Sequence, residues 1–202
     1  MKTAPTITEK VLSKVDDLGR GSVFTPGKFL NLGSRSAIDK TLSRLAQRGV
    51  IRRLAHGIYD YPKTHPQLGI LSPSTEDILA ALADSEKFKV QPSGAYAANL
   101  LGLSDQVPMR IVFLTDGIPR RVVIGKREII LKRTSPRQME TAGRISGLVI
   151  QALKYLGKLH VDPDLLKRLN SRLKPDDKQQ LSSDIENAPG WMAVYLKELA
   201  KA

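Results

Sequence analysis

The chain has 202 residues, enough for one large domain or two small ones. Hydrophobic residues make up 41% of it, so a packed core is expected and disorder is not. The absence of cysteine excludes disulfides, thiolate zinc sites and thiol nucleophiles. No apolar run approaches the ~20 residues of a transmembrane helix, and Met1–Glu9 lacks the apolar centre of a signal peptide. We therefore expect a cytoplasmic protein that makes no membrane contact.

The net charge is +12, and it is unevenly distributed. Residues 1–62 hold eleven Lys and Arg against five Asp and Glu, whereas residues 63–202 hold twenty-one against fifteen. Each segment therefore carries +6, and the first is more than twice as basic per residue. Such an excess favours a polyanionic partner, because each neutralised phosphate releases a counterion. Solubility through net charge is the alternative, and the residue pattern has to decide between them.

Two helices are predicted at the start of the chain. Thr6 and Glu9 have the spacing of a capping box, and apolar residues follow at helical spacing as far as Leu18. Gly19 and Gly21 end this helix. A second, short helix begins after Thr25, which suits an N-cap, with Pro26 at the first helical position.

A third helix is predicted at about Ser34–Arg48, between Gly33 and Gly49. Its apolar positions share one face: Ile38, Leu42, Leu45 and Ala46. Its opposite face carries short polar and cationic side chains: Ser36, Lys40, Ser43 and Gln47, flanked by Arg35, Asp39 and Arg44. Ser36 has two open interpretations, because it also begins a capping-box pattern with Asp39.

A β-hairpin is predicted next, from Val50–Leu54 and Ile58–Tyr61 around a turn at Ala55–Gly57. Three helices followed by a hairpin are typical of a winged helix-turn-helix, which places its third helix in the DNA major groove. The candidate DNA-binding residues are Arg35, Ser36, Lys40, Ser43, Arg44, Arg52, Arg53 and His56. Because Arg52 and Arg53 alternate across a strand, at most one of them faces DNA. A solvated charged face and a simple turn role for His56 are the alternatives.

Residues 63–73 contain prolines and a glycine and are predicted to form a linker, with the body of the protein at 74–202. A helix is expected from Ser74, then a short strand at Lys87–Gln91 and a helix at Ala95–Leu101. Strands at Met109–Thr115, Arg121–Ile124 and Glu128–Lys132 are expected to pair antiparallel, with a hairpin turn at Asp116-Gly117. This sheet is basic, with eight Lys and Arg against two Asp and Glu between residues 110 and 137. It is either a second DNA contact or the polar face of a half-exposed sheet.

The remainder of the chain is predicted to be helical. One helix follows Glu140, a second begins at Asp162-Pro163, and two more begin near Pro175 and Pro189. The predicted fold class is α+β: an N-terminal winged helix-turn-helix, then an α/β body with a small antiparallel sheet and C-terminal helices.

Two groups of motifs resemble a known family over about residues 5–135. In the head they are Phe24-Thr25-Pro26, Gly33-Ser34-Arg35-Ser36-Ala37-Ile38-Asp39-Lys40, Gly49-Val50-Ile51-Arg52-Arg53 and Gly57-Ile58-Tyr59. In the body they are Gln91-Pro92-Ser93-Gly94-Ala95-Tyr96, Gln106-Val107-Pro108 and Leu114-Thr115-Asp116-Gly117. This pattern resembles the AbiEi-type antitoxins of abortive-infection systems and related transcriptional regulators. The C-terminal helices match it less distinctively.

The resemblance implies an antitoxin of a type IV toxin–antitoxin pair. Such a protein represses its own operon by binding double-stranded DNA at promoter repeats. Its body counteracts a nucleotidyltransferase-like toxin without requiring a stable complex. The head residues carry over to Arg35, Ser36, Lys40, Arg44, Arg52 and Arg53, and no body residue carries over. Pro92-Ser93-Gly94 also fits a plain strand-to-helix turn.

No catalytic or cofactor motif accompanies these features. The three histidines, His56, His65 and His160, lack metal-ligand spacing, and phosphate-binding loops and nucleophile elbows are absent. We therefore expect no enzyme activity, no metal and no cofactor. Two other hypotheses stay open: a winged-helix regulator whose body senses a small ligand, and an enzyme or RNA-binding module that uses the basic sheet.

Overall fold

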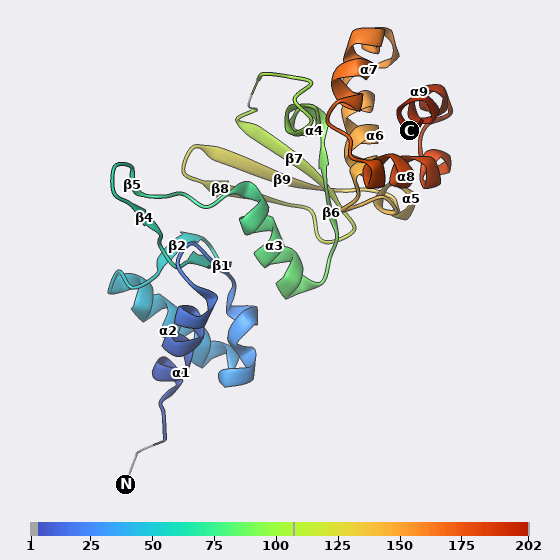
Figure 1. Ribbon diagram of the computed structural model, residues 1–202. Helices are drawn as coiled ribbons and strands as arrows, with labels where there is room; N and C mark the ends of the chain where they lie inside the picture. The colour runs from blue at the N-terminus through green and yellow to red at the C-terminus, as the bar shows by residue number, and fades with distance from the viewer. Residues whose placement is uncertain (1–3, 107, 202) are drawn as a thin grey trace. The chain divides into compact units, whose positions relative to one another are not determined.

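The structure is a computed structural model that describes residues 4–106 and 108–201 (Figure 1). Val107 of the body motif and the first three residues of Met1–Glu9 lie outside the described residues. The chain divides into two compact units, Met1–Lys87 and Phe88–Ala202. Both helices and strands occur in each unit, so the α+β class is confirmed. In the two described ranges, no helix is long and apolar enough to cross a bilayer.

The first unit combines four helical segments with short strands. The helical segments are α1 (Ile7–Leu18), the 3₁₀ helix η1 (Pro26–Leu32), α2 (Arg35–Gln47) and α3 (Thr75–Glu86). The strands are β1 (Val23–Phe24), β2 (Arg52–Ala55), β3 (Ile58–Asp60), β4 (Thr64–His65) and β5 (Gly69–Ile70). The predicted helix starts at Thr6 and Thr25 are confirmed as N-caps, and the Thr6–Glu9 capping box forms.

An apolar core joins α1, η1 and α2 to the strands β1 and β3. Phe24 and Phe29 meet edge to face with ring centroids 5.3 Å apart, and Tyr59 stacks on Phe24 at 6.5 Å. The other buried members are Val11, Val15, Ile38, Leu42, Leu45 and Ile51. Burial of the apolar stripe of α2 in this core leaves its polar stripe facing outward.

Three strands form one small antiparallel sheet in the order β1-β3-β2. The hairpin that the sequence predicts is β2–β3, and the two-residue β1 is an addition that the sequence analysis did not anticipate. All three residues of the central strand β3 are buried, including Asp60. A buried carboxylate requires a cation or a hydrogen-bond donor beside it, and for Asp60 this partner comes from the other strand of the hairpin.

The predicted linker and domain boundary differ from the structure. Residues 64–70 contain the exposed hairpin β4–β5, which projects from the first unit in Figure 1. α3 begins at the capping box of Ser74 and Asp77, as predicted, but it belongs to the first unit. It packs on β1 and η1, and its Asp84 carboxylate lies 3.0 Å from Lys28 Nζ. The boundary therefore falls after Lys87, because these contacts tie α3 to the preceding residues.

The second unit contains a four-stranded sheet and mostly short helices. The strands are β6 (Val90–Ser93), β7 (Arg110–Thr115), β8 (Arg120–Ile124) and β9 (Arg127–Arg133). The α-helices are α4 (Gly94–Leu100), α5 (Pro136–Met139), α6 (Ile145–Leu156), α7 (Pro163–Asn170), α8 (Pro175–Ser183) and α9 (Ala193–Leu199). The 3₁₀ turns are η2 (Lys158–His160), η3 (Ile185–Asn187) and η4 (Gly190–Met192). Helices begin at Pro163 and Pro175 as predicted, whereas Pro189 precedes a 3₁₀ turn.

The expected run of three consecutive antiparallel strands is wrong. The strand order is β6-β7-β9-β8, with β7 and β9 parallel, so β8 does not pair with β7. Asp116 does not turn a hairpin, because its carboxylate accepts the Lys89 backbone N–H at 2.7 Å and so anchors the residue before β6. The inner position goes to β9, whose Ile129 and Leu131 are buried, while β8 exposes Arg121 and Val123 at the edge.

The helix α6 is the centre of the second unit. It packs against α4, β6 and α8, and in Figure 1 the C-terminal helices gather around it. A Cβ atom on its Gly147 would overlap the backbone oxygen of Thr141 and the side chain of Gln91. The buried Gln91 in turn accepts the Gly143 backbone N–H at 3.3 Å, which joins β6 to the start of α6. Only glycine permits this close approach.

A buried carboxylate holds α6 to the end of α8. Asp184, 3% exposed, accepts hydrogen bonds from Ser146 Oγ and from Arg144 Nη1, the latter at 2.7 Å. Ser146 is fully buried, so loss of the acceptor would leave a hydroxyl without a partner inside the core.

Asp184→Ala is therefore expected to destabilise the second unit by about 2–3 kcal/mol, since the solvent exposure of Arg144 reduces the full cost of a broken buried pair. The only tryptophan, Trp191, packs against the core of this unit. Urea unfolding followed by its fluorescence measures the loss, with exposed Glu186→Ala as the control. Equal midpoints for the two variants would contradict this role.

Candidate nucleic-acid interface

The outward stripe of α2 is built by its N-cap and by its buried face. Ser34 Oγ accepts the Ala37 backbone N–H and begins the helix. Ile38, Thr41, Leu42 and Leu45 are buried in the core. On the opposite side, four exposed side chains share one stripe: Ser36, Lys40, Ser43 and Gln47. The helix register predicted from the sequence is confirmed.

The cap at Ser34 decides between the two interpretations of Ser36. Ser36 is the second residue of α2, it is exposed, and its hydroxyl is not used to begin the helix. It therefore lies at the N-terminal part of the outward stripe with Lys40 one turn later. Gln47 extends this stripe although it was not among the candidate site residues.

The cations on and beside the stripe differ in whether a carboxylate is paired with them. Arg35 Nε lies 2.9 Å from Asp39 Oδ2, an exposed pair of the kind that contributes little and exchanges easily. Within the described ranges, Lys40 and Arg44 lie within 4.0 Å of no carboxylate. The positive charge of α2 is thus concentrated at Lys40 and Arg44, with Arg35 partly neutralised.

Arg52 does not fit its predicted role as a DNA contact. Its Nε donates to Asp60 Oδ1 at 3.0 Å, and its Nη2 donates to the Leu71 carbonyl at 2.9 Å. Asp60 is 2% exposed, so the guanidinium neutralises a buried carboxylate. Arg52 therefore holds the hairpin β2–β3 to the chain that follows it, and the prediction is corrected on this point.

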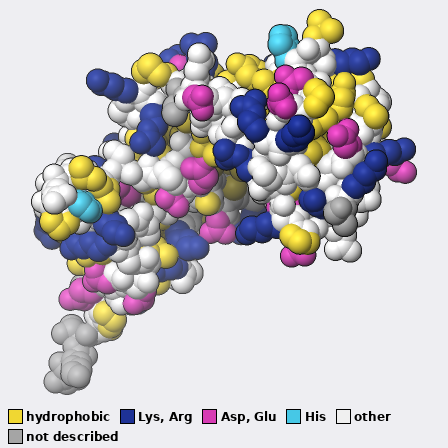
Figure 2. Space-filling view, turned by 45° about the horizontal axis from the view of Figure 1, so that its top comes forward, with side chains coloured by type: hydrophobic (Ala, Val, Ile, Leu, Met, Phe, Trp, Pro, Cys, Tyr) yellow, Lys and Arg dark blue, Asp and Glu magenta, His cyan; other side chains and the backbone are white. Residues whose placement is uncertain are grey.

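Arg53 and His56 remain together at the exposed end of the same hairpin. Arg53 Nη2 lies 3.1 Å from His56 Nδ1, and both side chains are exposed. A bulge between Arg53 and Ala55 and the positive φ of Gly57 turn the chain at this point. Figure 2 shows exposed Lys and Arg side chains on the first unit. Of the two neighbouring arginines, Arg52 is paired with Asp60 and Arg53 is exposed to contact a ligand, because successive side chains of a strand point to opposite faces.

Two further contacts hold the strands and helices of the first unit together. The Tyr61 hydroxyl donates to Asp16 Oδ1 at 3.0 Å, and this bond raises the pKa of Tyr61 because it favours the protonated phenol. Hydrogen bonds from Lys28 and Lys87 lower the pKa of Asp84. A lowered carboxyl pKa stabilises the fold above the unfolded-state value, and this contribution disappears as the pH falls through the folded-state pKa.

The hairpin β4–β5 is the exposed feature that the sequence analysis missed. His65 Nδ1 accepts the backbone N–H groups of Gln67 and Leu68, which closes its turn. Leu68 is 73% exposed and Ile70 is 58% exposed. β4 and β5 have only two residues each, so the sequence shows almost no alternation of apolar and polar residues there. The prolines around the hairpin indicated a linker instead.

The basic sheet of the second unit is partly neutralised. The Glu128 carboxylate lies 3.3 Å from Arg110 Nε and 2.7 Å from Arg121 Nε. The Arg120 guanidinium lies 5.4 Å from the centre of the Phe88 ring. These contacts favour the half-exposed sheet over a second DNA surface for β7 and β8. At the end of β9, Lys132 and Arg133 are exposed.

Comparison with known proteins places the chain in a family without assigning it a role. A family model matches residues 10–181, and the chain belongs to that family, DUF6088, a family of unknown function. The crystal structure of the Rv2827c protein from Mycobacterium tuberculosis is similar with a TM-score of 0.46 and 17% sequence identity, over 99% of this chain and 79% of that one. No curated protein matches the chain significantly.

The two neighbouring arginines of β2 are expected to behave differently on substitution. Arg52→Ala leaves the Asp60 carboxylate buried without its partner and should destabilise the first unit by about 2–3 kcal/mol. Arg53→Ala should change this stability by less than about 0.5 kcal/mol. Hydrogen exchange of the β3 amides reports on both variants. Faster exchange in the Arg53 variant alone would reverse the assignment.

Proposed function

We propose that the first unit is a winged helix-turn-helix that binds double-stranded DNA, with α2 as its recognition helix and β2–β3 as its wing. The observation that carries the proposal is the outward stripe of α2. Its residues are short or flexible polar side chains and a cation, the types that hydrogen-bond to base edges and phosphates. The order α1, η1, α2, β2, β3 supports it, because a winged helix places these elements in this sequence.

The roles within this interface follow from position along α2. The helix has 13 residues, about 20 Å in length, and a major groove ~12 Å wide accepts it. Ser36, Lys40 and Ser43 are proposed to lie against base edges, since base contacts arise mainly from the N-terminal part of a recognition helix. Arg44, Arg53 and His56 are proposed to contact phosphates.

The proposed biological role is that of an antitoxin that represses its own operon in the cytoplasm. It rests on the resemblance of residues 5–135 to AbiEi-type antitoxins. In this proposal the first unit binds promoter repeats, and the second unit counteracts a nucleotidyltransferase-like toxin without a stable complex. A regulator whose second unit senses a small ligand is a second candidate, favoured by two adjoining hollows in that unit.

Lys40→Glu is expected to weaken binding to the promoter repeats at least tenfold, because it places a carboxylate against phosphates or base acceptors. Lys158→Glu in the second unit makes the same change in net charge and is the control. Gel-shift titrations should show a log K against log salt slope of about −5 for the unaltered protein, as for roughly six phosphates contacted. Binding that is independent of salt and sequence, or equal loss in both variants, would exclude the proposal.

The antitoxin role makes a separable prediction. The role requires a nucleotidyltransferase-like toxin gene beside this one. In cells that express that toxin, the Lys40→Glu chain should lose repression of its promoter and still restore growth, because the proposed functions lie in different units. A promoter reporter and a growth assay in the same strain measure both. Failure of the unaltered chain to restore growth would reject the antitoxin role and leave the DNA-binding proposal intact.

A further inference from the structure

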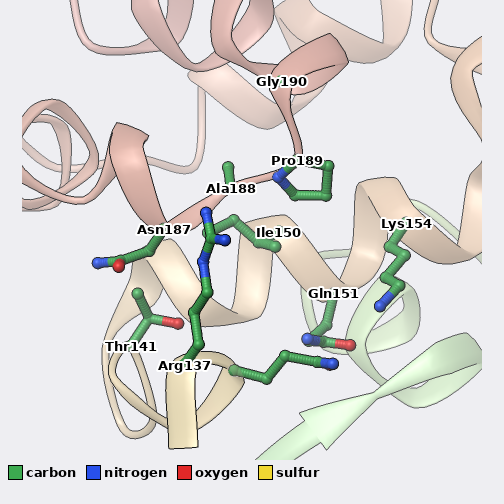
Figure 3. A pocket seen from close by; sticks show the side chains of 10 residues that line it. Arg137, Thr141, Ile150, Gln151, Lys154, Asn187, Ala188, Pro189 and Gly190 are labelled. Atoms are coloured by element: carbon green, nitrogen blue, oxygen red, sulfur yellow. The ribbon is translucent and has the colours of Figure 1, made fainter. Parts of the chain in front are cut away.

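Two adjoining hollows lie between the sheet and the helices of the second unit. The first, about 360 Å³, lies between α5, α6 and the segment Asn187–Gly190 (Figure 3). The second, about 400 Å³, lies between β6, β7, the end of β9 and α6. They share three lining residues, Gln138, Gln151 and Lys154. Their individual volumes fall within the range of small-ligand pockets.

The charged side chains that line these hollows are cations. Arg137 and Lys154 line the first, and Lys132, Arg133 and Lys154 line the second. Among the described residues, neither lining contains an aspartate or a glutamate. In the described part of the chain, none of these four cations forms an ion pair, and Arg137 donates only to the Glu186 carbonyl, at 3.3 Å. Cations gathered at a concave surface without carboxylates favour an anionic ligand.

A buried amide marks the place where the hollows meet. Gln151 is 6% exposed, and one end of its amide hydrogen-bonds to Ser93 Oγ at 3.2 Å. Within residues 4–106 and 108–201, the other end of the amide has no protein partner, and Figure 3 shows the side chain at the wall of the hollow with Lys154 nearby. This end of the amide borders the hollows, where it can donate a hydrogen bond to a ligand or to water.

Two apolar residues and one aromatic residue also line the second hollow. Val112 and Leu114 form part of the second hollow, and Tyr155, 53% exposed, stands at its edge. An exposed aromatic ring next to an apolar wall stacks well on a nucleobase. Lys154 and Gln151 line both hollows, so a ligand that spans the two hollows meets both side chains.

We propose that these hollows form a mononucleotide-binding site, with the phosphate at Arg137, Lys154 and Gln151 and the base against Tyr155. This site gives the second candidate function a ligand class. It stands or fails independently of DNA binding by α2, because none of its residues belongs to the first unit.

Calorimetry on the full chain tests the site with four probes at fixed ionic strength: AMP, GMP, inorganic phosphate and adenosine. The nucleotides should bind, phosphate should bind more weakly, and adenosine should bind at least tenfold more weakly than AMP. Trp191 follows the lining residue Gly190, so its fluorescence gives a second readout. Absence of binding by AMP, GMP and phosphate would overturn the proposal.

Three variants assign the parts of the site. Lys154→Gln and Arg137→Gln should each weaken AMP about tenfold or more, whereas Tyr155→Ala should weaken AMP and leave phosphate unchanged. All three side chains are exposed, and Lys197→Gln, outside both hollows, is the matched control. Unchanged AMP affinity in all three site variants would overturn the proposal. So would equal losses of AMP and operator binding in the Lys154 variant, which would assign these cations to the DNA backbone.

Discussion

The buried Asp60 carboxylate is the constraint on which the first unit depends. It lies on the central strand of the sheet, opposite Val23 on one side and Arg52 on the other. A charge in that position needs an adjacent cation, and Arg52 supplies it while also binding the Leu71 carbonyl. One pair of side chains thereby joins both strands of the hairpin to the segment that follows. It also leaves Arg53, on the other face of β2, exposed beside His56.

The second unit depends in the same way on polar groups that are buried with their partners. Gln91 joins β6 to the chain before α6, and Asp184 joins the start of α6 to the end of α8. These bonds position α6 so closely to β6 that a glycine is required at residue 147. They also place Gln151 of the same helix where two hollows meet. The architecture that packs the helix thus creates the concave, basic surface beside it.

The two units therefore carry different chemistry. The first presents a convex helix whose outward side chains suit a groove, and the second presents concave hollows whose cations suit a small anion. Charge alone does not separate these uses, because both units have an excess of Lys and Arg. The difference lies in shape and pairing. Arg110 and Arg121 share Glu128 on an open sheet, whereas Lys154 and Arg137 line hollows in which no described residue is an aspartate or a glutamate.

Local patterns in the sequence determined the helix starts at Thr6, Thr25 and Ser74 and the register of α2, because caps and apolar periodicity act over a few residues. Only the tertiary structure decided which arginine of β2 is exposed, because the Asp60 partner of Arg52 comes from the neighbouring strand. The same holds for the order of the sheet, where Asp116 bonds to Lys89 instead of turning a hairpin. The Asp116–Lys89 bond joins residues far apart in the chain, and the Arg52–Asp60 pair, eight residues apart, forms only when β2 and β3 pair in register. A pattern of neighbouring residues does not show which group of another strand will satisfy a buried charge.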